Sequence, residues 1–326
     1  MKLTITRPLF RKAAAAALLL VPFFAHAQDY PKRPITIVVP FSAGGGTDSI
    51  ARELAKGLTE KLGQAVIIDN RGGGGGAIAA RQVAKADADG YTLLFVTSTF
   101  VTHAATETKT SYDVNKDYAP IAMIGRGPLM IVTHKGVGVK TVPQLVAATK
   151  AKPDGLDFCS SGTGSITHLA GELFKQKTGA NLTHVPYKGS GPATVDFLAG
   201  RTQVFFATFP TMLQHVKSGS VEIIATTAAK RSPLFPNVPT VAEAGIANFN
   251  LTTWWGIVAP AGTPQPIVDK LNQLINDAAA KEPIKGRLVN EGAEAYRASP
   301  AEFRSMLSSE LAMWKDVVKS GNIKLD

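Results

Sequence analysis

The sequence predicts an α/β protein with two lobes, each a mainly parallel sheet flanked by helices. Strand-like and helix-like segments alternate from residue 35 onward, which favours parallel sheets with helices on both faces. The chain has 326 residues, enough for two domains of ordinary size. A strand, a glycine-containing loop and a helix follow one another at residues 35–62, and this arrangement is repeated at residues 156–174.

The first 27 residues predict a secretory signal peptide. Basic residues lie at the start, an apolar run follows at 13–25, and Ala25-His26-Ala27 has the pattern of a cleavage site. The apolar run is too short for a membrane span, which needs about 20 residues. We therefore expect a soluble mature protein that begins near Gln28. Part of the formal net charge of +10 then belongs to the signal.

The glycine-rich stretch at residues 40–48 carries the first indication of function. The β-branched run at 35–39 predicts a buried strand, and apolar residues recurring every four positions at 50–62 predict a helix. Thr47 or Asp48 is expected to cap that helix. A loop at a helix N-terminus presents backbone N–H groups and a partial positive charge, which favour an anion. No Gly-Lys-Ser/Thr follows, so a Walker-type phosphate loop is not predicted.

The remaining predicted strands and helices follow along the chain, and no stretch of sequence is repeated. Strands are predicted at residues 65–68, 91–96, 121–124, 129–133, 156–159, 204–206, 221–226 and 251–258, and helices at 77–85, 142–150, 166–174, 193–199, 267–278 and 300–318. Residues 102–117 are polar and are expected to be irregular. The Gly-Arg-Gly-Pro segment at 125–128 is expected to cross into a second lobe, and residues 251–258 to cross back.

Three loops end predicted strands, at residues 41–48, 97–99 and 160–165. In open α/β sheets ligands bind beyond the carboxyl ends of the strands, so all three are expected to face one cleft. They carry hydroxyl and backbone N–H groups and almost no charge, which suits a carboxylate held by neutral donors. Trp254 and Trp255 are adjacent in a predicted strand, so we expect one in the cleft and one in the core.

Other classes of function have weaker support. The glycines at 72–76 fit a dinucleotide-binding motif only loosely, because no acidic residue closes a second strand about 20 residues later. Ser165 and His168 lie three residues apart without a Gly-x-Ser-x-Gly motif, which favours a helix cap over a hydrolase pair. The histidines lack zinc-ligand spacing, and the single cysteine, Cys159, is expected to be buried. No cofactor, metal or nucleic acid is expected.

Several ordered motifs resemble one family of receptors and cover essentially the whole mature chain. They are Pro40-Phe41-x-x-Gly44-Gly45-Gly46-Thr47-Asp48, Asn70-Arg71-x-Gly73-x-Gly75-Gly76, Ala88-Asp89-Gly90-Tyr91-Thr92-Leu93-Leu94, His168-Leu169-Ala170-Gly171-Glu172-Leu173-Phe174, His184-Val185-Pro186-Tyr187-Lys188-Gly189, Val238-Pro239-Thr240-Val241-Ala242-Glu243-Ala244-Gly245 and Ala259-Pro260-Ala261-Gly262-Thr263-Pro264. Together they resemble the extracytoplasmic solute receptors of the tripartite tricarboxylate transporter family, often called Bug receptors.

The resemblance implies a two-lobed, type II-like periplasmic binding protein with a carboxylate ligand enclosed at the hinge. Lobe 1 is expected to comprise residues 28–126 and 254–326, and lobe 2 residues 127–253. The ligand-binding residues that it implies are Phe41, Ser42, Ala43, Gly44, Gly45, Gly46, Thr47, Thr97, Ser98, Ser161, Gly162, Thr163, Ser165 and Thr208.

Two positions depart from the family pattern. Relatives often have Pro where Gly72 stands, so the second glycine loop is expected to be looser. They also often carry Asp or Asn where Ala207 stands, and a ligand ammonium group would need such a partner. We therefore expect an amine-free organic acid, and Phe41, Phe209 and the tryptophan pair would tolerate an aromatic one.

The resemblance also implies partners. The receptor is expected to act as a periplasmic monomer, without catalysis, and to deliver its ligand to a membrane permease. The alternative is a receptor that reports ligand occupancy to a sensor protein without transport. A secreted hydrolase is the third interpretation. The role of Lys188 is open between contact with an anion and a solvated turn.

Overall fold

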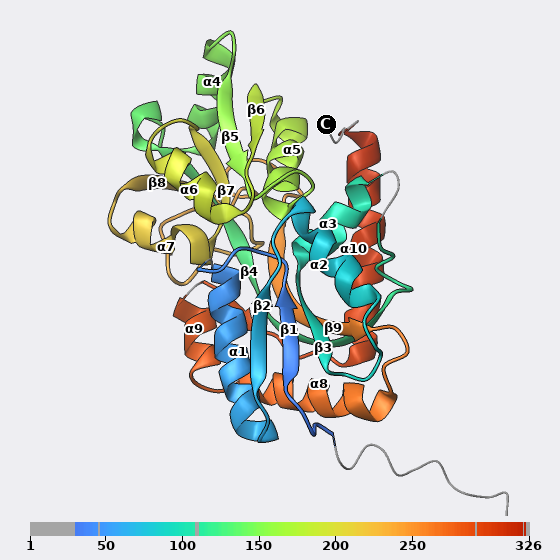
Figure 1. The fold of residues 1–326 in the computed structure, drawn as a ribbon. Helices are drawn as coiled ribbons and strands as arrows, with labels where there is room; N and C mark the ends of the chain where they lie inside the picture. The colour runs from blue at the N-terminus through green and yellow to red at the C-terminus, as the bar shows by residue number, and fades with distance from the viewer. Residues whose placement is uncertain (1–29, 45, 108–110, 291, 322, 324–326) are drawn as a thin grey trace, which may run out of the picture.

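The computed structural model describes residues 30–44, 46–107, 111–290, 292–321 and 323. The predicted signal peptide lies outside these residues. Within them, no helix combines the length and apolar character needed to cross a membrane. Figure 1 shows two halves, one above the other, each with strands at its centre and helices around them.

The lower half in Figure 1 combines strands from both ends of the chain. Their order is β2 (Val66–Asn70), β1 (Ile35–Val39), β3 (Thr92–Thr97), β9 (Thr252–Pro260) and β4 (Tyr118–His134). β1 is parallel to β2 and β3, whereas β9 is antiparallel to β3 and β4. The short β10 (Glu294–Ala295) pairs with β4.

The upper half continues from the far end of β4. Its other strands are β5 (Leu156–Ser160), β6 (Leu182–Pro186), β7 (Val204–Thr208) and β8 (Val221–Thr226). β5 is parallel to β6 and β7, and β4 is antiparallel to β7 and β8. The predicted parallel arrangement is therefore present in both halves, and β4 and β9 add antiparallel pairs that make the sheet mixed.

Helices cover the strands of both halves. They are α1 (Gly46–Leu62), α2 (Ala77–Ala84), α3 (Ser98–Thr106), α4 (Val142–Ala151), α5 (Ile166–Thr178), α6 (Ser190–Leu198), α7 (Phe209–Lys217), α8 (Gln265–Ala279), α9 (Ile284–Asn290) and α10 (Pro300–Ser320), with 3₁₀ turns η1 (Gly74–Gly76) and η2 (Lys135–Val137). One cluster of buried apolar side chains extends through both halves beside α3, α5 and α10. Further clusters pack under α1 and α8 in the lower half and under α6 and α7 in the upper half.

The prediction of two strands separated by residues 125–128 was wrong, because β4 is one continuous strand of 17 residues. Gly125 stays in the ladder opposite Trp255, and Pro128 stays opposite Thr252. A side chain at Gly125 would come within 2.8 Å of the carbonyl oxygen of Glu294. The glycine therefore allows close approach of β10 and does not break the strand.

Three helix boundaries also differ from the prediction. Part of the stretch expected to be irregular belongs to α3, all of whose residues are buried, and this burial overrides the weak helix propensity of its Ser and Thr residues. α1 begins at Gly46, so Thr47 and Asp48 lie in its first turn and not at its cap. α6 begins at Ser190, three residues before the start expected at 193.

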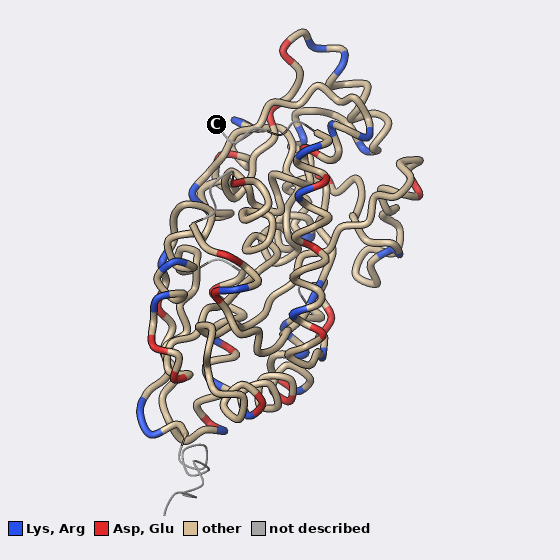
Figure 2. Tube along the Cα trace, turned by 90° about the vertical axis from the view of Figure 1, so that its right-hand side faces the viewer, with Lys and Arg blue, Asp and Glu red and all other residues tan. Residues whose placement is uncertain are grey.

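Basic and acidic residues are interspersed along the trace in Figure 2. Several form exposed ion pairs, such as Arg33 with Asp89 and Arg231 with Glu243, both at 2.8 Å. Exposed pairs of this kind contribute about 0–1 kcal/mol each. The stability of the fold therefore rests mainly on its apolar core.

A partly buried carboxyl group lies beside the strand that crosses between the halves. Trp254 on β9 is 1% exposed, and its Nε1 donates a hydrogen bond of 2.8 Å to Oε2 of Glu310 on α10. Burial raises the pKa of Glu310 to about 7, and the bond from Trp254 opposes this rise only in part. The ordinary pKa of this group is 4.5.

This shift predicts that the protein loses stability as the pH rises through 7. The folded state retains a proton that the unfolded chain releases above pH 4.5, so the contribution is complete below pH 4.5 and is lost through pH 7. The loss is at most about 1.4 kcal/mol per pH unit. Denaturant unfolding from pH 4 to 8, followed by tryptophan fluorescence, measures it. Glu310→Gln should abolish this component and Glu60→Gln, on exposed α1 surface, should not; an unaltered profile in Glu310→Gln would contradict the assignment.

Candidate functional site

The loop after β1, residues 40–44, is held by Asp48 in the first turn of α1. The Gly44 N–H donates to Oδ2 of Asp48 over 2.9 Å, and Nε of Arg52 donates to the same oxygen over 2.9 Å. Nδ2 of Asn70 donates to the other carboxylate oxygen, also over 2.9 Å. The Asn-Arg motif therefore acts here through Asn70, which fixes the first loop.

Asp48 is ionised and already paired. Burial by itself would raise its pKa, but the bonds from Arg52, the Gly44 N–H and Asn70 outweigh burial and hold the pKa below its usual range. The negative charge of Asp48 is therefore used to shape the loop. Because this carboxylate is already hydrogen-bonded within the protein, it does not need a cationic ligand as a partner.

Four backbone N–H groups of the second loop, residues 160–165 at the start of α5, donate hydrogen bonds within the protein. Its N–H groups donate from Ser161 to Thr167 Oγ1 (2.9 Å), from Gly162 to Ser160 Oγ (3.1 Å), from Gly164 to His168 Nδ1 (3.1 Å) and from Ser165 to the Gly162 carbonyl (3.1 Å). The hydroxyls of Ser161 and Thr167 lie 3.0 Å apart, and both residues line the same cavity. This loop therefore faces the cavity mainly with hydroxyl groups.

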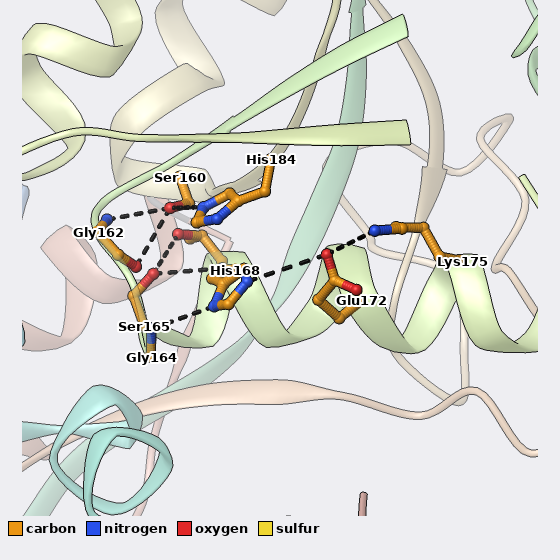
Figure 3. Close-up of polar contacts among 9 residues, drawn as sticks. Ser160, Gly162, Gly164, Ser165, His168, Glu172, Lys175 and His184 are labelled. Carbon is orange, nitrogen blue, oxygen red and sulfur yellow. Dashed lines mark hydrogen bonds and ion pairs between the residues drawn. The ribbon is translucent and has the colours of Figure 1, made fainter. Parts of the chain in front are cut away.

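Two histidines support the second loop, as Figure 3 shows. The rings of His168 on α5 and His184 on β6 stack with centroids 3.8 Å apart. Nε2 of His184 shares a 2.6 Å hydrogen bond with Oγ of Ser160. His168 accepts the Gly164 N–H through Nδ1, so this ring nitrogen carries no proton.

The surroundings of the pair keep His184 neutral. Burial lowers the pKa of His184 to about 3, and the charges of His168 and Lys175 act in the same direction. Glu172 lies 3.9 Å from Nε2 of His168 and forms a 2.9 Å ion pair with Lys175. In the sequence, His168 and His184 show no ligand-like spacing. The fold brings them together because β5 and β6 pair, with Phe158 opposite His184.

Five helices begin at the wall of one cavity of about 210 Å³. α1, α3, α5, α6 and α7 each contribute their first residues or their N-cap to the lining. The N-caps of α6 and α7, Gly189 and Thr208, make no side-chain capping bond. Each helix N-terminus carries unsatisfied N–H groups and a partial charge of roughly +0.5. The cavity therefore has the electrostatics of an anion site.

Most of the predicted ligand-binding residues are brought together in this cavity. Those that line it are Phe41, Ser42, Ala43, Gly44, Gly46, Thr47, Thr97, Ser161 and Thr208. Gly162 and Thr163 line an adjoining cavity. Ser98 and Ser165 are each 1% exposed; Ser98 bonds to Thr253 over 2.9 Å, and Ser165 caps α5. Gly45 lies outside the described residues. The assignment of these residues to ligand binding stays a prediction.

Part of the cavity lining was not predicted from the sequence. The missed residues are Ile166, Thr167, Ser190, Gly191, Pro192, Pro210, Thr211 and Thr253, whereas Thr99 belongs to a loop expected at the cleft. Most of them lie at the starts of helices in the upper half. Hydroxyl residues directly after predicted strands, as in the segment 208–211, were the signal that could have identified them.

The two tryptophans confirm the alternation expected in a strand. Trp255 lines the cavity, whereas Trp254 packs against Phe303 with ring centroids 5.5 Å apart. Phe209, expected near the ligand, is 1% exposed and packs against Phe235. Aromatic surface in the cavity therefore comes from Phe41 and Trp255.

The two halves touch across the cavity. Oγ1 of Thr102 on α3 donates to the Gly164 carbonyl over 2.7 Å. Gly46 on α1 faces Pro210 on α7 so closely that a side-chain carbon at position 46 would overlap the Pro210 ring. These contacts join the lower half to the upper half on opposite sides of the site.

The geometry does not favour the hydrolase interpretation. Oγ of Ser165 accepts the backbone N–H of His168 over 3.2 Å, which is the helix cap preferred from the sequence. Cys159 is fully buried, and burial raises the pKa of its thiol to about 12. In the described part of the chain, no three His, Cys, Asp or Glu side chains are grouped to hold a metal.

The chain has two halves, each built around a sheet, and strands that cross between them. A cavity lies between the halves. This is the architecture of the solute-binding proteins. The family model described as "Tripartite tricarboxylate transporter family receptor" matches residues 50–323, and the chain belongs to this family. The resemblance seen in the motifs is thereby confirmed. Members of the family are periplasmic solute-binding receptors and not enzymes.

Individual relatives agree over nearly the full length. Protein BugT of Bordetella pertussis is 38% identical over 301 residues, which cover 92% of each chain. The solved structure of R. palustris Rpa4515 with adipate has a TM-score of 0.87 and 37% identity, covering 91% of this chain and 99% of that one. MatC from Rhodopseudomonas palustris with bound malate has a TM-score of 0.84 and 32% identity, covering 89% and 100%.

The pKa of His184 predicts acid sensitivity of the second loop. Because it is lowered from 6.5 to about 3, the unfolded chain binds a proton that the folded protein excludes between these values. This contribution to stability is present above pH 6.5 and is lost as the pH falls towards 3, by at most about 1.4 kcal/mol per unit.

Unfolding of His184→Gln, measured between pH 3 and 7, should show a shallower acid slope than the parent protein. His215→Gln, at the end of α7, is the matched control for loss of one imidazole. Equal slopes in the parent protein and His184→Gln would show that His184 is not held neutral by the fold.

Proposed function

We propose that this receptor captures a small organic acid through its carboxylate and delivers it to a membrane permease. The observation that carries the proposal is the convergence of five helix N-termini on one cavity. An anion placed there meets N–H groups and the positive ends of the helix dipoles. The charge of Asp48, the acidic residue in the described lining, is already paired with Arg52 at 2.9 Å.

An amine-free acid fits this lining better than an amino acid. A ligand ammonium group needs a carboxylate or several acceptors, and Asp48 is engaged by three donors. Ala207 is fully buried in β7, so no acidic side chain is supplied from that position. The relatives named with adipate and with malate support a carboxylate ligand, since both compounds are amine-free acids.

Ligand capture is proposed to occur by closure of two lobes. We assign residues 28–126 and 254–326 to lobe 1 and residues 127–253 to lobe 2. The hinge then lies where β4 and β9 pair, around Gly127 opposite Thr253. The ligand would shift an existing equilibrium towards the closed form by binding that form more tightly. The family supports a periplasmic location, with the signal peptide cleaved near Ala27, and a permease that recognises the closed form.

The first test is thermal unfolding of residues 28–326 with mono-, di- and tricarboxylates, aromatic acids and amino acids. A ligand at 100 times its dissociation constant stabilises the folded state by about 2.7 kcal/mol. Amine-free carboxylates should raise the melting temperature, and amino acids of similar size should not. Stabilisation by amino acids alone, or by none of these compounds in ligand-free protein, would contradict the proposed ligand class.

Closure itself predicts the effect of Gly46→Ala. The added methyl group overlaps Pro210 only when α1 and α7 approach, so the open protein should fold normally. Overpacking of this kind costs about 1–3 kcal/mol, so affinity should fall by about 5- to 150-fold. Isothermal titration with the carboxylate identified by the panel measures the change.

Two matched variants separate closure from other effects. Gly57→Ala lies on the same helix, where the nearest atoms would be 3.9 Å from the new carbon, and should leave affinity unchanged. In a Pro210→Gly background the obstruction is absent, so Gly46→Ala should no longer weaken binding. Equal loss of affinity with and without Pro210 would exclude the proposed contact.

A further inference from the structure

Ser165, Thr167 and Ser161 form a chain of hydroxyl groups that leads from the start of α5 to the cavity. Oγ of Ser165 lies 2.9 Å from Oγ1 of Thr167, and this atom lies 3.0 Å from Oγ of Ser161. Ser165 and Thr167 are each 1% exposed, whereas Ser161 is partly exposed and lines the cavity. The proposed function rests on the helix N-termini and leaves this chain of hydroxyl groups without a role.

The hydrogen bonds from the main chain limit how the three hydroxyl protons can be arranged. Each hydroxyl group has one proton to donate and two lone pairs that accept. Oγ1 of Thr167 already accepts the Ser161 N–H over 2.9 Å, and Oγ of Ser165 accepts the His168 N–H over 3.2 Å. Thr167 can therefore accept from only one of the two serine hydroxyls, and it donates to the other. The protons follow the chain in one of two directions.

The burial of Ser165 decides between these directions. Within the described part of the chain, Oγ of Ser165 has no hydrogen-bond partner besides the His168 N–H and the Thr167 hydroxyl. If Thr167 donated to Ser165, the buried proton of Ser165 would have no acceptor, and a buried donor without an acceptor is costly. Ser165 therefore donates to Thr167, and Thr167 donates to Ser161.

This direction leaves the proton of Ser161 for the cavity. Oγ of Ser161 accepts from Thr167, and its own proton meets no acceptor among the residues that the structure describes. Hydrogen bonds that follow one another in a chain polarise each other, which strengthens the last donor. In the opposite direction Ser161 would donate to Thr167 and present only lone pairs to the cavity, where a carboxylate, which only accepts, could not bind to them.

We propose that Ser165 and Thr167 are positioning residues that orient the Ser161 hydroxyl as a hydrogen-bond donor towards the cavity. The second loop then selects for a group that accepts hydrogen bonds, without a charged side chain of its own. Ser165 has this task in addition to capping α5. The inference rests on the proposed function, because the carboxylate of the proposed ligand is the acceptor.

The test is isothermal titration with the amine-free acids of the thermal panel, among them succinate, citrate and benzoate, using the acid that the parent protein binds most tightly. Ser161→Ala removes the donor and should weaken binding by about 10- to 150-fold, as expected for one charge-assisted hydrogen bond. Ser165→Gly removes the first hydroxyl of the chain but keeps a residue that suits an N-cap. It should weaken binding by about 2- to 12-fold, the equivalent of one neutral hydrogen bond.

A double-mutant cycle separates positioning from a merely structural role. If Ser165 acts through Ser161, Ser165→Gly should cause no further loss of affinity in a Ser161→Ala background. Thr167→Val keeps the shape of the side chain without its hydroxyl and should also lose affinity, and Thr167→Ser should restore most of that loss. Ser299→Gly removes the N-cap serine of α10, outside the cavity lining, and is the matched control that should leave affinity unchanged.

Thermal unfolding without ligand verifies that each variant is folded, and the cycle between Ser161 and Ser165 decides the matter if Thr167→Val does not fold. Additive losses of affinity in Ser161→Ala and Ser165→Gly would overturn the positioning role, as would an unchanged affinity in Ser165→Gly. In both cases the proposed carboxylate receptor would still stand. Failure of every acid to bind the parent protein would overturn the proposed function and this inference with it.

Discussion

The site depends on the antiparallel pairing of β4 with β9. The two strands pair from Tyr118 opposite Pro260 to Pro128 opposite Thr252, and β4 then continues into the upper half to pair with β7 and β8. Both halves therefore share one strand. This shared ladder sets the loops after β1 and β3 opposite those after β5 and β7. The cavity forms because those loops lead directly into helices.

The charge distribution follows from this arrangement. Helix N-termini supply positive potential from the main chain. The ionised side chain of Asp48 accepts hydrogen bonds from Arg52 and Asn70, and these bonds hold the first loop in place. The second loop is shaped by neutral groups, with His168 and His184 stacked beneath it. A binding site can therefore favour an anion with few charged side chains of its own. Among the residues that the structure describes, Lys188 is the basic residue that lines this cavity, and it forms no ion pair or hydrogen bond with another of them.

Much of the first loop was predictable because its signal is local. A β-branched run, glycines and a four-residue apolar period occur in succession, and the structure has β1, a loop and α1 in that order. Local signals failed at α3, where burial overrides propensity, and at β4, where Gly125 admits β10 and does not end the strand. Ser165 was correctly interpreted as a cap because Ser before a helix acts through its own first turn.

By itself, the sequence determined the α/β class, the positions of many of the strands and helices, and the family resemblance. Each of these depends on residues close together in the chain or on ordered motifs. Only the tertiary structure decided that Gly46 meets Pro210, that His168 stacks on His184, and that His103 lies against the glycines at 72–76. Such contacts join residues far apart in sequence, and strand pairing and helix packing, which no local pattern encodes, bring them together.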